Sequence, residues 1–255
     1  MKQILVIYTW PPRDPRFLYF TIKFTESYYK HPSGIPHDVI VAVKDDTVSK
    51  FPFNIENISP LAGHIRKVEW LAVGDYGYDI GPFLRIARER QDEYDYVVLL
   101  GVYARILVDG WLKKLTDALD TYDVVSATGS FEKGISSYTR NPSLRTTAFA
   151  ISPKLLTKLW PTTAENQSSV MHNKRECYEF EHGNHSIYRR AIALGRRGAV
   201  VGIDRAYPEK EWDQSCTFRK EEQRNLIVAD NHTDTWMNSD TATRNFYTRL
   251  AGFTL

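Results

Sequence analysis

The sequence is poor in cysteine, with only Cys177 and Cys216 among its 255 residues. Two thiols exclude a disulfide framework and a zinc site built from several cysteines. Neither cysteine has a base or a second thiol near it in the sequence, which argues against a nucleophilic or redox role. We therefore expect both thiols to be reduced, in a protein that works in the cytoplasm.

Long hydrophobic runs are absent as well. Segment 1–14 holds only a short apolar run before polar and proline residues, which is too short for the apolar region of a secretory signal peptide. No stretch approaches the ~20 apolar residues of a membrane-spanning helix. We expect no integral membrane segment, so any membrane association would be peripheral, at the inner face.

The chain also lacks an excess of charge of one sign, since 33 basic and 31 acidic residues leave a net charge of +2. Duplex DNA is bound through several concentrated phosphate contacts, so this balance argues mildly against DNA as a partner. An apolar content of 42% and a charged content of 25% are ordinary for a globular protein. Without repeats or a low-complexity linker, we expect one domain, with a first half at 1–130 and a second at 131–255.

What the sequence does have is short β-branched runs that alternate with helical segments. Up to residue 130 this alternation predicts a parallel, doubly wound α/β sheet. We expect strands at 3–10, 37–46, 64–73, 94–107 and 122–130, and helices at 16–31, 80–93 and 108–119. The less regular second half is expected to hold strands at 144–152 and 198–204, helices at 153–160 and within 174–195, and a mobile loop at 161–175.

The ends of the predicted strands carry aromatic, acidic and glycine residues. In an open α/β sheet the ligand binds outside the carboxyl ends of the strands, near the point where the strand order reverses. Aromatic rings, carboxylates and glycines at one edge suit a nucleotide, although each residue taken alone is explained equally well as part of a polar loop. The residues expected at this edge are Tyr8, Thr9, Asp45, Asp46, Asp79, Tyr103 and Arg105.

Longer segments resemble a known enzyme class. "DVIVAVKDD" and "GDYGYDIGPFLRIARERQDEYDYVVLL" are similar to the nucleotide-binding half of GT-A glycosyltransferases. "GYDIGPFL", "NPSLRTTAF", "YEFEHGNHSIYRR" and "TFRKEEQRNLIVADN" resemble a group of bacterial and phage glycosyltransferase-like proteins. The resemblance covers most of the chain. It implies a Rossmann-like fold and transfer of a sugar from a nucleoside diphosphate to an acceptor hydroxyl, with inversion.

The resemblance implies roles for several acids. Asp45 or Asp46 takes the position that contacts the nucleoside, and Asp79 the turn position that binds base or ribose. A cap for the helix beginning at Ile80 is the alternative for Asp79. Glu181 takes the place of the general base, with Glu179 as runner-up. The alternative for Glu181 is a purely structural position in the first turn of a helix, where the helix dipole stabilises its negative charge.

The sequence departs from the family at its metal site. The Asp-x-Asp pair that holds Mn²⁺ or Mg²⁺ in the family is missing around 101–103. Arg105 and Arg145 could meet the diphosphate instead, acids elsewhere could hold the metal, or the protein could bind a nucleotide sugar without turnover. His182 and His185 lack the spacing of a helical zinc motif. His232 is either a late metal ligand or a loop histidine without a ligand.

The acceptor side is expected in the second half, along segment 211–231. Ser130, Trp212 and Arg219 are the residues expected to contact the acceptor. The alternative for the aromatic residues of the segment is packing against the sheet. Candidate acceptors are a surface polysaccharide, a lipid-linked glycan or, in a phage protein, a hydroxymethylated DNA base. A nucleotidyltransferase is less well supported, because "TWPPRDPR" lacks a glycine-rich phosphate loop.

Overall fold

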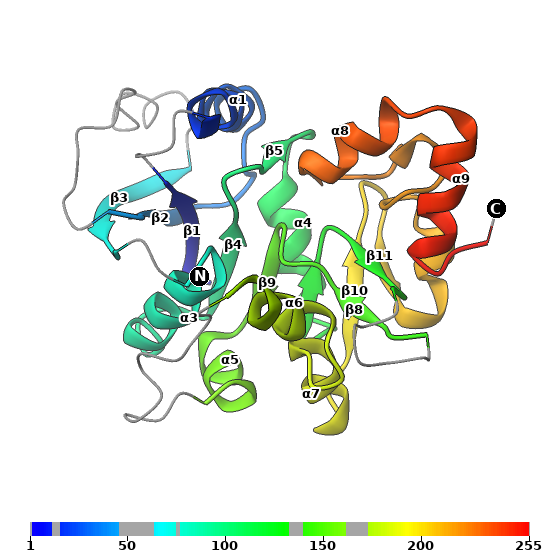
Figure 1. Cartoon of the computed structure of the whole chain (residues 1–255). Coiled ribbons are helices and arrows are strands. Elements are labelled where there is room, and N and C mark those ends of the chain that lie inside the picture. The colour runs from blue at the N-terminus through cyan, green and yellow to red at the C-terminus, as the bar shows by residue number, and fades with distance from the viewer. Residues whose placement is uncertain are drawn as a thin grey trace.

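The computed structural model describes residues 2–11, 16–45, 64–74, 77–132, 140–161 and 173–254. An eight-stranded, largely parallel sheet forms its centre and is flanked by helices (Figure 1). Its strands, in spatial order, are β3 (Ile65–Ala72), β2 (His37–Val43), β1 (Ile4–Trp10), β4 (Tyr96–Leu100), β9 (Phe149–Ile151), β6 (Val124–Ser126), β10 (Gly198–Val201) and β11 (Ala206–Pro208). The α/β class predicted from the sequence is confirmed.

Strand direction is mixed in the second half of the sheet. β1 to β4 pair in parallel, but β9 lies between β4 and β6 and runs antiparallel to both. β11 is antiparallel to β10 at the edge. All residues of β1 are buried, as expected for a central strand that is covered on both faces.

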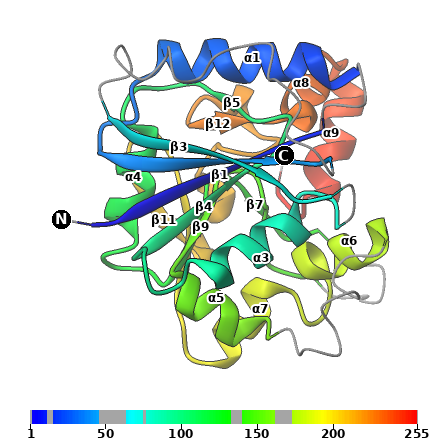
Figure 2. The same cartoon turned by 90° about the vertical axis from the view of Figure 1, so that its left-hand side faces the viewer.

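The sheet separates two apolar cores. The described helices are α1 (Arg16–Lys30), α3 (Ile80–Glu89), α4 (Trp111–Ala118), α5 (Pro153–Leu159), α6 (Lys174–His182), α7 (Ile187–Ala193), α8 (Asn231–Met237) and α9 (Thr241–Leu250). Helices α1 and α4 cover one face of the sheet, and α3, α5, α6 and α7 cover the other. In Figure 2, α1 lies above the sheet and α3, α5 and α7 lie below it. Helices α6, α8 and α9 gather on the side to which the carboxyl end of β1 points.

Small antiparallel pairs close this end of the sheet. β5 (Arg105–Ile106) pairs with β12 (Val228–Ala229), and β7 (Gly129–Ser130) pairs with β8 (Ser143–Leu144). The expected strands at 94–107 and 122–130 are therefore each divided into two strands in different sheets. These breaks turn the chain away from the central sheet directly after β4 and β6.

Other differences concern helices. The single longer helix expected within 174–195 is two helices, α6 and α7. A side chain at Gly183 would collide with the backbone of Glu179, and Ser186 caps the start of α7. Helices α8 and α9 were not predicted. The loop expected at 161–175 lies mostly outside the described residues, as does Asp46.

The described helices include none whose length and apolar character would let it cross a membrane.

Candidate functional site

The order of the strands sets a topological switch point between β1 and β4. From β1 the chain moves to β2 and β3 on one side, and β4 lies on the other side, so the strand order reverses at this pair. Ligands of open α/β sheets bind at such a point, outside the carboxyl ends of the strands. The residues that end these two strands are therefore the first candidates for a binding site.

Asp79 lies at this point. A methyl group added at Gly101, directly after β4, would stand 2.9 Å from Asp79 Oδ2, so the carboxylate approaches the end of β4 through the space that glycine leaves. Asp79 occupies the residue before α3 but forms no capping hydrogen bond there. The alternative of a helix cap is thus not supported, and the side chain lies beside the end of β4 instead.

The environment of Asp79 disfavours its charge. Burial raises the pKa of Asp79 above its ordinary value, and the nearby Thr9 hydroxyl and Lys44 ammonium offset this only in part. A partly buried carboxyl with a raised pKa at the carboxyl edge of an open α/β sheet is a functional-site candidate. Thr9 and Asp79, both predicted from the sequence, do come together.

The other predicted donor residues lie in different surroundings. Tyr8 is fully buried and stacks on Phe24 with ring centroids 3.8 Å apart, so it belongs to the core. Asp45 is buried directly after β2. Tyr103 packs its ring edge-on against Phe20 of α1, 4.7 Å between centroids.

Arg105 joins β5 to α8. Its guanidinium forms an ion pair with Asp234. The pair connects the strand that follows β4 with one of the two unpredicted helices.

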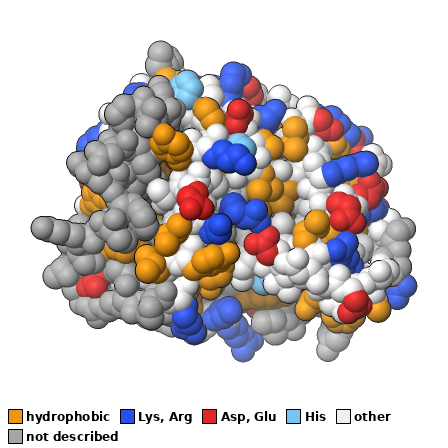
Figure 3. Space-filling view, turned by 90° about the horizontal axis from the view of Figure 1, so that it is seen from above, with side chains coloured by type: hydrophobic (Ala, Val, Ile, Leu, Met, Phe, Trp, Pro, Cys, Tyr) orange, Lys and Arg blue, Asp and Glu red, His pale blue; other side chains and the backbone are white. Residues whose placement is uncertain are grey.

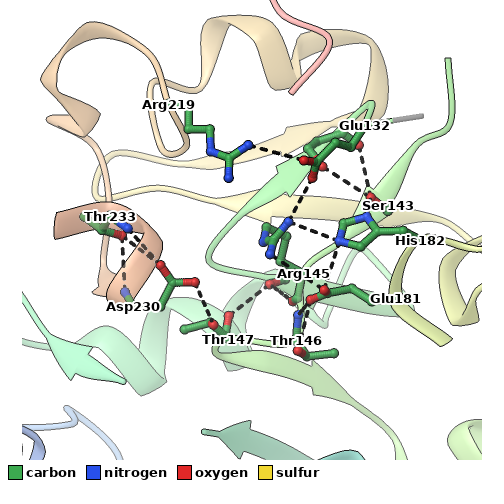
Figure 4. A network of polar contacts seen from close by, with 12 residues as sticks. Glu132, Ser143, Arg145, Thr146, Thr147, Glu181, His182, Arg219, Asp230 and Thr233 are labelled. Atoms are coloured by element: carbon green, nitrogen blue, oxygen red, sulfur yellow. Dashed lines mark hydrogen bonds and ion pairs between the residues drawn. The ribbon is translucent and has the colours of Figure 1, made fainter. Parts of the chain in front are cut away.

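A second group of polar side chains lies on the same side of the sheet, around the turn before β9 (Figure 4). Arg145 is 8% exposed, and its Nη1 lies 3.1 Å from Glu132 Oε2, while its Nη2 lies 3.7 Å from Glu181 Oε2. Burial would lower the pKa of Arg145, but the Glu181 and Glu132 carboxylates reverse this and raise it. Arg145 therefore stays charged within the protein.

Glu181 is the best-connected acid of this group. The Thr146 backbone N–H donates to Glu181 Oε1 at 2.6 Å, the Thr146 hydroxyl donates to the same oxygen at 3.0 Å, and His182 Nε2 lies 2.9 Å from Oε2. Burial would raise the pKa of Glu181, but Arg145, His182 and the Thr146 N–H lower it far below its ordinary value. The carboxylate is held ionised.

The position of Glu181 in its helix corrects one expectation. It lies in the last turn of α6, where the helix dipole disfavours an acid, and not in a first turn. The helix-dipole explanation of this residue is therefore wrong, and Arg145 and His182 supply the stabilisation. Glu179, the runner-up, places its carboxylate beside Gly183.

His182, weighed from the sequence only as a metal ligand, is a member of this group. Its Nδ1 shares a hydrogen bond with Ser143 Oγ at 2.7 Å, which puts Ser143, His182 and Glu181 in a line like that of a hydrolytic triad. Ser143 is fully buried, however, and its hydroxyl also lies 3.3 Å from Ser130. A substrate cannot reach this serine, so the line orients Glu181.

Two of the predicted acceptor residues are internal. Trp212 is 1% exposed, donates its indole N–H to the Tyr207 carbonyl and packs 5.3 Å from Phe131. This confirms the alternative, packing against the sheet, for Trp212. Ser130 is also fully buried.

Arg219 is the acceptor-side residue that reaches the cluster. It pairs with Glu132 at 3.3 Å, and burial lowers its pKa against the opposing effect of that carboxylate. Asp230 lies near by and accepts a hydrogen bond from the Thr147 hydroxyl at 3.3 Å. His232 follows in the first turn of α8 and not in a loop. Burial lowers its pKa against Asp230, with Arg145 and Arg219 acting in the same direction as burial.

Cys177 connects the two parts of the rim. Burial raises the pKa of its thiol to about 12, and the charges of Asp79 and Glu181 add to this effect. The thiol therefore lies within electrostatic range of both carboxylates. The thiol stays protonated at neutral pH, in agreement with the expectation that it is not a nucleophile.

Across the described residues, no three or more His, Cys, Asp or Glu side chains are grouped so that they could hold a metal ion. The positive groups of the rim are Lys44 and the two buried arginines.

No known protein-family profile matches the sequence, and no curated protein matches it either.

Proposed function

We propose that this protein is a glycosyltransferase of the GT-A type that uses a nucleoside diphosphate sugar as its donor. The observation that carries the proposal is the position of Asp79 at the switch point between β1 and β4, on the same rim as the Arg145–Glu181 cluster. The order β3-β2-β1-β4 is that of the first half of a dinucleotide-binding sheet, which supports a nucleotide ligand.

In this proposal each part of the rim has one task. Asp79 contacts the nucleoside, and guanidinium groups neutralise the two phosphates in place of the missing Asp-x-Asp metal site. Glu181 accepts the proton of the acceptor hydroxyl. Its depressed pKa makes it a weak base while Arg145 is paired with it. A donor diphosphate that draws Arg145 away would raise the pKa of Glu181 and so activate the base only when the donor is bound.

The acceptor class follows from the surface. Viewed from above, Lys and Arg side chains alternate with Asp and Glu, without a wide field of one sign (Figure 3). Duplex DNA is attracted by concentrated positive charge. A glycan or lipid-linked glycan is therefore the proposed acceptor, ahead of a modified DNA base.

The test is the slow hydrolysis of donor in the absence of acceptor. Purified protein is incubated with a panel of uridine, guanosine, cytidine and thymidine diphosphate sugars, with Mn²⁺ or with EDTA, and free sugar is measured. We expect release from one donor, retained in EDTA, lost in Glu181→Gln and kept in Glu179→Gln. Release by Glu181→Gln at the wild-type rate would remove Glu181 from the mechanism.

A second candidate is a protein that binds a nucleotide sugar without turnover. The low pKa of Glu181 favours it, because an acid so strongly paired is a poor base. Thermal unfolding with each nucleoside diphosphate separates the two candidates. A ligand at 100 times its Kd adds about 2.7 kcal/mol to the stability. Stabilisation by one nucleotide with no sugar release from any donor would support the binder.

A further inference from the structure

One carboxylate separates two buried guanidinium groups. Glu132 Oε2 lies 3.1 Å from Arg145 Nη1, and Glu132 Oε1 lies 3.3 Å from Arg219 Nη1 (Figure 4). The two arginines are 8% and 6% exposed. Each oxygen of the carboxylate thus serves one arginine, which is the arrangement in which two arginines hold a phosphate group.

This single carboxylate leaves both arginines with unused hydrogen-bonding capacity. Arg145 Nε and Arg219 Nε are buried and have no hydrogen-bond partner among the residues that the structure describes. Both Cζ atoms stand over the ring of Phe218, at 4.9 Å and 4.7 Å from its centre. Two positive charges near one ring repel each other, so an anion between them is stabilising, and Glu132 fills that place here.

Arg219 has a strained backbone conformation that hydrogen bonds hold in place. Arg219 has a φ of 48°, and Glu221, Glu222 and Gln223 also have positive φ values, in a region that side chains disfavour. The Gln223 side chain accepts from the Arg219 N–H at 3.0 Å, and Thr248 of α9 donates to the Arg219 carbonyl at 2.6 Å. Strained residues of this kind cluster at ligand-binding sites.

We propose that Arg145 and Arg219 form a binding site for a phosphate-bearing anion, and that Glu132 occupies this site internally until the anion displaces it. The proposal rests on the proposed function for the identity of the natural anion, which is then the donor diphosphate. A phosphate group offers more acceptor oxygens than a carboxylate and can therefore accept hydrogen bonds from both guanidinium groups at once. The Glu132 side chain is 14% exposed and can turn outward.

The displacement would have a consequence for the neighbouring acid. Arg145 contacts both Glu132 and Glu181. An anion that takes over Arg145 weakens its attraction for Glu181. Occupation of the site by phosphate and the proton affinity of Glu181 are therefore coupled.

The experiment uses inorganic pyrophosphate as the probe at constant ionic strength, with calorimetric titration of the full chain. We expect saturable binding to the wild type, at least tenfold tighter binding to Glu132→Gln, from which the internal competitor is removed, and loss of binding in Arg219→Gln. Asp230→Asn is the matched control: it removes one negative charge from the same cluster without touching either arginine contact, and should tighten binding by much less.

Equal tightening in Glu132→Gln and Asp230→Asn would reduce the effect to general electrostatics and overturn the proposal. So would unchanged or weaker binding in Glu132→Gln, or its failure to fold at any pyrophosphate concentration. Wild-type binding that persists in Arg219→Gln would overturn it independently of the Glu132 variant. Pyrophosphate binding without sugar release from any donor would leave this site standing and refute the transferase.

Discussion

At the scale of single residues, two carboxylates on one rim are held in opposite states. Burial raises the pKa of Asp79 toward its neutral form, whereas Arg145, His182 and Thr146 overcome burial and lower that of Glu181. Environments that push the pKa values of neighbouring acids apart are typical of sites in which the acids have different tasks. The opposite shifts predict opposite effects of pH on stability.

For Asp79 we expect Asp79→Asn to increase the free energy of unfolding at neutral pH. Because the pKa of Asp79 is higher in the folded than in the unfolded protein, the protonated carboxyl stabilises the fold. This contribution is complete below pH 3.8, the unfolded-state pKa, and is lost as the pH rises through the folded-state pKa. The amide carries no charge and removes this loss. Urea unfolding from pH 4 to 8 measures it, and a nucleotide that protects the wild type should protect the variant less. An unchanged pH dependence would contradict a raised pKa.

For Glu181 the sign is reversed. Because the pKa of Glu181 is lower in the folded than in the unfolded protein, the ionised carboxylate stabilises the fold. This contribution is complete above pH 4.5, the unfolded-state pKa, and is lost as the pH falls below it. Glu181→Gln leaves Arg145 with less compensation, so we expect a loss of about 3 kcal/mol at pH 7, near the lower end for a broken buried pair because Glu132 remains. The difference between wild type and variant should shrink in acid. Stability measured at pH 7 and at pH 3.5 tests this.

At the scale of elements, α8 and α9 begin in the same way. Asp230 accepts from the Thr233 N–H at 3.0 Å, and Asp240 accepts from the Thr243 N–H at 2.9 Å. Only α8 is also tied to the turn before β9, through Asp230 and Thr147. Asp230 therefore caps α8 and also holds Thr147 of the site, whereas Asp240 only caps α9.

We expect Asp230→Ala to destabilise the protein by about 1 kcal/mol, the usual effect of removing an N-cap, and Asp240→Ala to destabilise it for the same reason. Only Asp230→Ala should also change the affinity for pyrophosphate or nucleotide, and by more than the charge-only change Asp230→Asn, because it also releases Thr147 beside Glu181. Chemical unfolding and ligand titration of both variants give the comparison. If Asp240→Ala changed ligand binding equally, the effect would belong to the C-terminal region as a whole and not to this contact.

The elements of the first half could be predicted because each is a local pattern. The apolar run of β1 and the periodicity of α3 fix strand and helix without knowledge of the partner. Asp79 and Thr9 were found because parallel strands bring their carboxyl ends together. The Asp-x-x-Thr pattern before α8 and α9 was available in the sequence as an N-cap signal.

Most of the charged cluster could not be predicted. Arg145 and Glu181 were each named as candidates, but Glu132 and His182 were not seen as their partners. These contacts join residues far apart in the chain, and no periodicity records them. The burial of Tyr8 and Ser130 likewise depends on what covers them.

At the scale of the whole molecule, one sheet runs through both halves of the sequence. β9, from the second half, pairs with β4 and β6 of the first half. Neither half can complete its sheet without the other. The expectation of a single domain remains a prediction, and this pairing gives it a physical reason.

We therefore expect a single cooperative unfolding transition. The six tryptophans are spread over both halves, so urea curves from fluorescence and from far-UV circular dichroism should coincide. A fragment ending at residue 132 lacks β9 and should not unfold cooperatively. Two separated transitions, or a cooperatively folded fragment, would show that the halves are independent.

The late arrival of β9 has a consequence during synthesis. The ribosome synthesises β4 about 50 residues before β9, the strand that pairs with the free edge of β4. At typical elongation rates this is a delay of about 3–10 s. During this time β4 is an apolar edge strand with unpaired N–H and C=O groups, which can pair with a strand of another chain. Slower translation across 101–148 should lengthen this exposure and favour aggregation, and a chaperone that shields this edge should relieve it.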